Sequence, residues 1–99
     1  MSSLDIGAFA NKLPAAWESR VISRVGSAAI KILRMDGQAL PEEVHGYTEV
    51  LLVLEGVLHL ESEGRALAIG AGELFEARAG IPHRVLSGSQ GTLLIIDQD

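Results

Sequence analysis

Short apolar runs separated by turns limit this chain, from Val21 onward, to a fold built from β-strands. Apolar runs of about four to eight residues bounded by Gly, Pro, Asn, Asp or Ser are typical of strands, whereas helices need longer segments with a 3.6-residue period. Turns this frequent favour an all-β sandwich or jelly roll over a helix-linked parallel sheet. The expected strands are Val21–Val25, Ala28–Met35, Glu49–Leu54, Val57–Glu61, Arg65–Ile69, Glu73–Arg78, His83–Ser87 and Thr92–Asp97.

The first twenty residues follow a different pattern. Their apolar residues are spaced as on a helix, Asp5 can cap it, and Pro14 ends it. We expect residues 1–20 to form an N-terminal arm with a short helix, packing on the barrel or on a partner subunit. With 99 residues in all, the chain has room for one domain. Residues 21–99 are therefore expected to form that single β-barrel domain.

Charge and composition exclude several classes of partner. The formal net charge is −5, and the basic residues are scattered from Lys12 to Arg84 without forming a run. Nucleic acid is therefore not an expected partner, because phosphate binding needs clustered cations. The chain has no cysteine, which excludes disulfides and thiolate chemistry. No apolar stretch reaches the ~18 residues of a membrane span, and the start has no signal-peptide pattern, so we expect a cytoplasmic protein that contacts no membrane.

Two histidines and a carboxylate stand close to the starts of predicted strands. His45 precedes the strand that begins at Glu49, and His83 opens a later strand. Such residues can converge inside a small barrel, where two imidazoles and one carboxylate bind Fe(II), Mn(II) or Zn(II). Strand alternation places Leu51 on the same face as Glu49. His59 alternates with leucines that face inward, so we expect it at the surface and not among the ligands.

The spacing of these residues resembles the first motif of the cupin superfamily. That motif is Gly, five residues, His-x-His, three or four residues, Glu, six residues, Gly. Here it reads Gly37, five residues, Glu43-Val44-His45, three residues, Glu49, six residues, Gly56. Every spacing fits, and Glu43 stands where the motif has its first histidine.

A second stretch resembles the other cupin motif, which is Gly, five residues, Pro-x-Gly, two residues, His, three residues, Asn. This chain has Gly72, five residues, Arg78-Ala79-Gly80, two residues, His83, three residues and Ser87. Arg78 replaces the proline and Ser87 the asparagine. The resemblance covers most of the chain and implies an all-β, cupin-like jelly-roll barrel.

The resemblance also implies a divalent metal ion (Fe, Mn, Zn or Ni) held by His45, Glu49 and His83. Glu43 falls at the position of the fourth ligand. Three possibilities stay open: Glu43 completes the ligand set, it turns away and leaves a two-histidine, one-carboxylate site, or the metal site is weak or lost.

Two classes of function are compatible with such a site. One is a metal-dependent oxygenase or isomerase acting on a small organic molecule, with Glu43 as fourth ligand or general base and Tyr47 as proton donor. The other is a non-catalytic module that binds or senses a small ligand, and a structural protein with an empty barrel is a third possibility. Exposed apolar strand faces, with Phe9 and Trp17, favour a homodimer.

Overall fold

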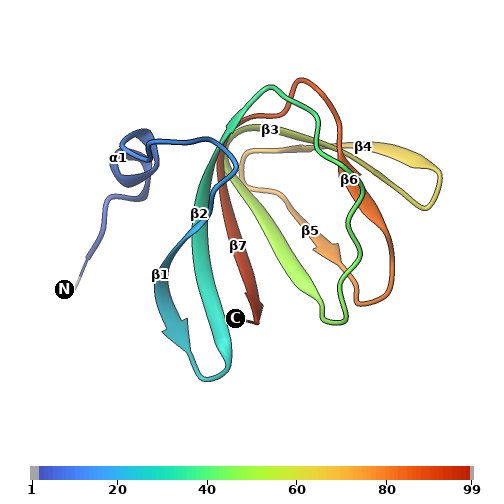
Figure 1. Cartoon of the computed structure of the whole chain (residues 1–99). Helices are drawn as coiled ribbons and strands as arrows, with labels where there is room; N and C mark the ends of the chain where they lie inside the picture. The colour runs from blue at the N-terminus through green and yellow to red at the C-terminus, as the bar shows by residue number, and fades with distance from the viewer. Residues whose placement is uncertain (1–2, 99) are drawn as a thin grey trace.

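Over residues 3–98, which the computed structural model describes, the chain forms one short helix and seven strands (Figure 1). The strands make one antiparallel sheet in the order β1-β2-β7-β3-β4, and β5 and β6 pair separately with β3. This sheet curls into an all-β jelly-roll barrel. The elements are α1 (Ile6–Asn11), β1 (Arg20–Val25), β2 (Ala28–Asp36), β3 (Glu49–Ser62), β4 (Arg65–Gly70), β5 (Leu74–Ala77), β6 (His83–Val85) and β7 (Gln90–Gln98).

The long strand β3 joins the two halves of the barrel. Its first part pairs with β7 and β5, and its last part pairs with β4 and β6. The expectation of two strands separated by a turn at Glu55-Gly56 is wrong, because β3 continues through this point. The pairing register with β7 shifts between Val53 and Glu55, and Gly56 takes a φ of 84°. A bulge and a glycine let the strand turn a corner without ending, and Figure 1 shows the bend.

Strand alternation positions the core between the two halves. Leu51, as predicted, and Val53 are buried on the face of β3 that Glu49 also occupies. Each is opposite a β7 residue, Ile95 and Leu93 respectively, and Leu93 is in turn opposite Leu33 on β2. These inward rows form a layer that supports the site. The buried cluster consists of Leu33, Met35, Leu51, Val53, Leu58, Leu60, Ile69 and Leu93.

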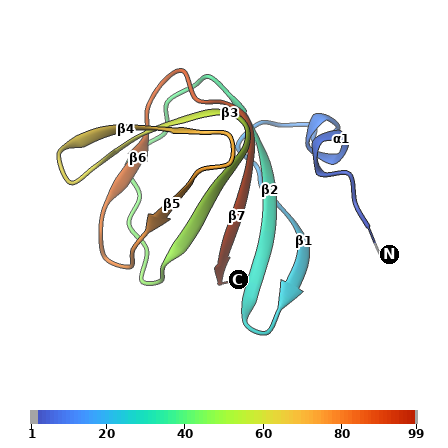
Figure 2. The ribbon, with the colours of Figure 1, turned by 180° about the vertical axis from the view of Figure 1, so that it is seen from behind.

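The N-terminal segment runs along β2. Asp5 caps α1 by accepting a hydrogen bond from the Ala8 N–H (3.0 Å), as the sequence predicts. In Figures 1 and 2, α1 lies beside the β1–β2 side, away from β4. The first two residues of the expected arm and the last residue of the expected barrel domain lie outside the described range. Within residues 3–98, no helix combines the length and apolar character needed to cross a membrane.

Candidate metal centre

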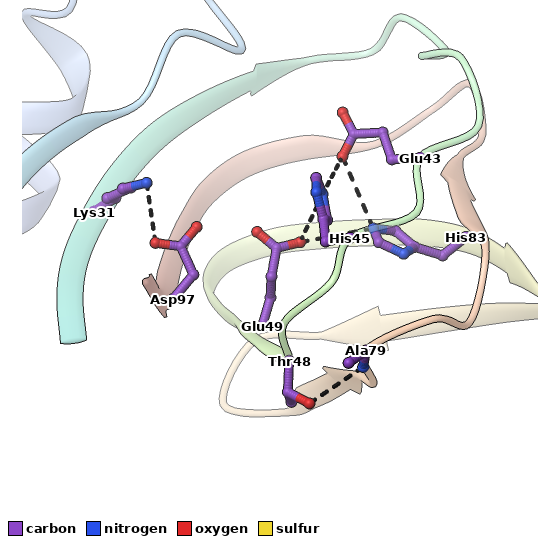
Figure 3. A network of polar contacts seen from close by, with 8 residues as sticks. All are labelled: Lys31, Glu43, His45, Thr48, Glu49, Ala79, His83 and Asp97. Atoms are coloured by element: carbon purple, nitrogen blue, oxygen red, sulfur yellow. Dashed lines mark hydrogen bonds and ion pairs between the residues drawn. The ribbon is translucent and has the colours of Figure 1, made fainter. Parts of the chain in front are cut away.

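Four potential metal ligands converge inside the barrel. Glu43 and His45 lie in the loop between β2 and β3, Glu49 is the first residue of β3, and His83 is the first residue of β6. One ligand atom from each residue lies within 4.8 Å of all the others. Figure 3 shows the four side chains pointing toward one another from separate strands and the loop. The structure thus brings together all the ligand positions that the sequence singles out.

The separations between these ligand atoms fit a single ion. Nε2 of His45 lies 3.2 Å from Oε2 of Glu43 and 3.5 Å from Oε1 of Glu49. Nε2 of His83 lies 3.9 Å and 3.8 Å from the same two oxygens. Ligand atoms at about 2.0–2.2 Å from one ion are roughly 3 to 4.5 Å apart. The residues present therefore fit a divalent metal ion.

Backbone hydrogen bonds hold the loop ligands in place. Glu43 and His83 exchange two of them, with N···O distances of 2.8 and 2.9 Å, so that the loop adds a short bridge to β6. The carbonyl oxygen of His45 accepts from the Gly80 N–H (2.8 Å). On the other side of the loop, Thr48 Oγ1 accepts from the Ala79 N–H (3.2 Å). The segment before β6 therefore positions both ends of the ligand-bearing loop.

The carboxylates of the site differ in environment. The side chain of Glu49 is 10% exposed, whereas that of Glu43 is 52% exposed. Burial, followed by a hydrogen bond with Asp97, raises the pKa of Glu49 above its ordinary value. Glu49 is thus a buried candidate ligand whose negative charge a bound cation would stabilise, while Glu43 stands at the solvent-facing side of the centre.

Sequence reasoning missed an ion pair behind Glu49. Lys31 Nζ lies 3.0 Å from Asp97 Oδ1, and their side chains are only 17% and 5% exposed. Figure 3 shows Lys31, Asp97 and Glu49 in a row beside the other ligands. Charged residues are rarely buried unless paired. The sequence could have indicated a buried lysine, because Lys31 precedes Leu33 by two residues on the same strand and therefore shares its inward-facing side.

Tyr47 packs on one of the candidate ligands. Its ring is stacked on that of His45, with centroids 5.1 Å apart and an angle of 17° between the planes. Burial, and then the negative charges of Asp97 and Glu49, raise the pKa of the Tyr47 hydroxyl. The phenol therefore keeps its proton at neutral pH and can act as a hydrogen-bond donor.

The four candidate ligands line one cavity of about 260 Å³. Beside the four candidate ligands, it is lined by Tyr47, Lys31, Asp97 and a set of apolar side chains. His59 lies outside the group of four. Arg78 does not line this cavity, and its Nε donates to Glu76 Oε1 at 2.8 Å. Such a cavity has room for a compact molecule.

The comparisons with known proteins identify the family. Residues 33–98 match the Cupin domain family model, about two thirds of the chain. The chain therefore belongs to the cupin family, and the resemblance seen in its two motifs is confirmed. Among curated proteins, none matches the chain.

Solved structures share the whole fold at low sequence identity. A cupin-2 domain protein from Shewanella frigidimarina has a TM-score of 0.88 at 21% identity, with 97% of this chain and 94% of that chain covered. A protein from Neisseria meningitidis has a TM-score of 0.83 at 18% identity, covering 99% and 100% of the two chains. One from Thermus thermophilus has a TM-score of 0.79 at 24% identity, covering 99% and 97%. These likenesses concern the fold.

Proposed function

We propose that this cupin binds one divalent metal ion through Glu43, His45, Glu49 and His83, and that a small oxygen-bearing organic molecule binds beside it. The observation that carries this proposal is the convergence of four ligand atoms within 4.8 Å on the wall of a cavity. Two carboxylates neutralise a divalent ion and favour oxygen-preferring metals such as Mn(II) and Fe(II) over Cu or Ni. A bound ion of this kind supplies Lewis acidity, and iron adds redox chemistry.

The residues around the ion supply the groups that an oxygenase or isomerase needs. Tyr47, which is stacked on His45 and stays protonated, can donate a hydrogen bond from its hydroxyl to a substrate oxygen, and it is the proposed proton donor. Glu43 is half exposed, so it can exchange protons with solvent as a general base or serve as the fourth ligand. The apolar wall excludes water from the reacting molecule. We therefore propose a metal-dependent oxygenase or isomerase acting on a compact substrate.

Metal content tests the proposed site directly. We expect near-stoichiometric metal in protein purified without chelators, and its loss in His83→Ala, because His83 supplies a ligand atom from a buried side chain. His59→Ala is the matched control, since His59 lies outside the group of ligands. Elemental analysis measures both. Protein metal sites bind tightly enough to stay filled after reconstitution. A metal content below about a tenth of an equivalent therefore contradicts the proposal.

A non-catalytic binding or sensing module is the second candidate. Glu43 in place of the motif histidine favours it, because a second carboxylate lowers the Lewis acidity of the ion. Small-molecule screening of the metal-loaded protein separates the two. Stabilisation by a ligand without any product, with Fe(II) and oxygen present, identifies a binding module, whereas turnover identifies an enzyme.

We also propose a homodimer formed through the edge strand β1. Val21 and Val25 on this strand are 41% and 66% exposed, and β1 is at one end of the sheet order. Exposed apolar edge strands pair readily with another chain. Sedimentation of wild type and Val25→Lys tests this proposal: a monomer in both contradicts it. A cytoplasmic location stays a prediction.

A further inference from the structure

Part of the wall of the cavity that holds the candidate metal ligands comes from the N-terminal segment and not from the barrel. Trp17, which lies between α1 and β1, lines the cavity together with the candidate metal ligands. It also packs against the buried core cluster. The segment that carries it turns back beside the end of β2 (Figure 1). The single tryptophan of the chain is therefore part of the site and not an isolated surface residue.

The backbone of Trp17 is strained, and both of its N–H groups are used to hold it. Its φ is 66°, in the left-handed region that bulky side chains rarely adopt. The backbone N–H donates to the Arg34 carbonyl (2.9 Å), and the indole Nε1–H donates to Asp36 Oδ1 (2.7 Å). Strain of this kind persists only where the surroundings determine the conformation, and it is concentrated at ligand clamps and active sites.

The cavity is polar at one part and apolar at another. The polar part holds the four candidate ligands with Tyr47, Lys31 and Asp97. Apart from Lys31, the charged groups of this part are carboxylates. A divalent ion together with the lysine therefore neutralises their charge, and no positive charge is left to pair with a second acidic group on a ligand. The apolar lining consists of Leu33, Leu40, Leu51, Leu58, Val85, Leu93 and Ile95, together with Trp17. A ligand that fills the cavity is therefore polar at one end only.

We propose that Trp17 is a ligand-binding residue that stacks on the flat apolar body of a small molecule, whose oxygen-bearing end faces the metal centre. This inference rests on the proposed function, and it narrows the ligand class to compact aryl-type molecules that carry oxygen at one end. An indole face packs best on another planar group. Holding the ring in advance lowers the entropy lost on binding.

Two hydroxamates test this inference because they share one oxygen-chelating head and differ only in the body. Benzohydroxamate carries a phenyl ring, and acetohydroxamate carries a methyl group. Calorimetric titration of the metal-loaded full chain should show benzohydroxamate binding at least about tenfold more tightly. Trp17→Leu, which keeps an apolar but non-planar side chain, should lose this preference without weakening acetohydroxamate. Trp17→Phe, which keeps a planar ring, should retain most of it.

Phe9→Ala, which also replaces an aromatic residue of the N-terminal arm, is the matched control. Phe9 lies on α1 and does not line the cavity, so its loss should leave the preference unchanged. Equal affinities of the two hydroxamates for wild type, or an unchanged preference in Trp17→Leu, would overturn the inference. Metal titration of wild type, made first, keeps the two failures apart: absence of bound metal contradicts the proposed function, whereas bound metal without a phenyl preference contradicts the role of Trp17.

Discussion

At the scale of single residues, Glu43 is the main departure from the family motif. It stands where the first motif histidine is expected, and its Oε2 lies 3.2 Å from Nε2 of His45. Its side chain is about half exposed, whereas Glu49 and His83 are buried. A carboxylate at this position would alter which metals the candidate site prefers. It would not move the site, because the backbone bridge to His83 holds residue 43 in place whatever its side chain.

Replacing Glu43 by histidine should shift the metal preference. Imidazole favours Zn(II) and Ni(II), while carboxylate favours Mn(II). We expect Glu43→His to raise the ratio of zinc to manganese affinity at least about tenfold, or roughly 1.4 kcal/mol. Competitive titration with the two metals measures this ratio. An unchanged ratio would show that the side chain at position 43 does not reach the ion.

Glu49 gives the metal-free protein a defined pH dependence. Its pKa in the folded state is raised above the ordinary 4.5, first by burial and then by Asp97. The folded state therefore binds more protons than the unfolded state once the pH exceeds the unfolded pKa. Through this group the free energy of unfolding decreases as the pH rises from 4.5 through the folded pKa, and above that value the decrease is complete.

Glu49→Gln removes this titration. We expect the metal-free variant to gain stability relative to wild type as the pH rises, because glutamine does not ionise. Urea unfolding of both proteins between about pH 4 and pH 8 measures the difference. A difference that does not change with pH would contradict the raised pKa of Glu49.

At the scale of elements, the corner of β3 against β7 decides the shape of the barrel. Gly56 is opposite Gly91 in the ladder. A Cβ on Gly56 would lie 1.9 Å from the carbonyl oxygen of Gln90, and one on Gly91 would lie 1.9 Å from that of Glu55. Two backbones approach each other here more closely than any side chain allows. These glycines let β3 stay paired with β7 through the bulge while it bends, so that its second half reaches β4 and β6.

Gly56→Ala should be strongly destabilising, and Gly72→Ala is its matched control. Both glycines have a φ of 84°, but nothing lies within 4 Å of a Cβ built on Gly72. The control therefore costs only the backbone strain, about 1 kcal/mol. For Gly56→Ala we expect a loss of at least about 3 kcal/mol, because the backbone must move. Denaturant unfolding measures both. Similar losses would mean that the close approach of the two strands is not essential.

At the scale of the whole molecule, the candidate site connects segments that are far apart in the sequence. Its ligands come from the β2–β3 loop, the start of β3 and the start of β6. An ion that binds all of them stabilises the folded chain as a whole, because the unfolded chain cannot form this site. Under the proposed function, metal binding and the stability of the barrel are therefore linked.

Thermal unfolding should reveal this linkage. At a free metal concentration of about one hundred times Kd, the expected stabilisation is roughly 2.7 kcal/mol, seen as a higher Tm. The shift should disappear in Glu49→Gln and persist in His59→Ala, which leaves the four ligands intact. An equal shift in both variants would indicate metal binding elsewhere on the surface.

The sequence by itself predicted the β-rich fold, the cap at Asp5 and the residues that converge at the candidate centre. Local periodicity indicates strands, and motif spacing indicates which residues come together once the family fold is assumed. The tertiary structure decided three further features: the unbroken course of β3 through Glu55-Gly56, the Lys31–Asp97 pair behind Glu49, and the place of Trp17 on the cavity wall. Each depends on contacts between residues distant in the chain. No local pattern encodes which strands will face one another.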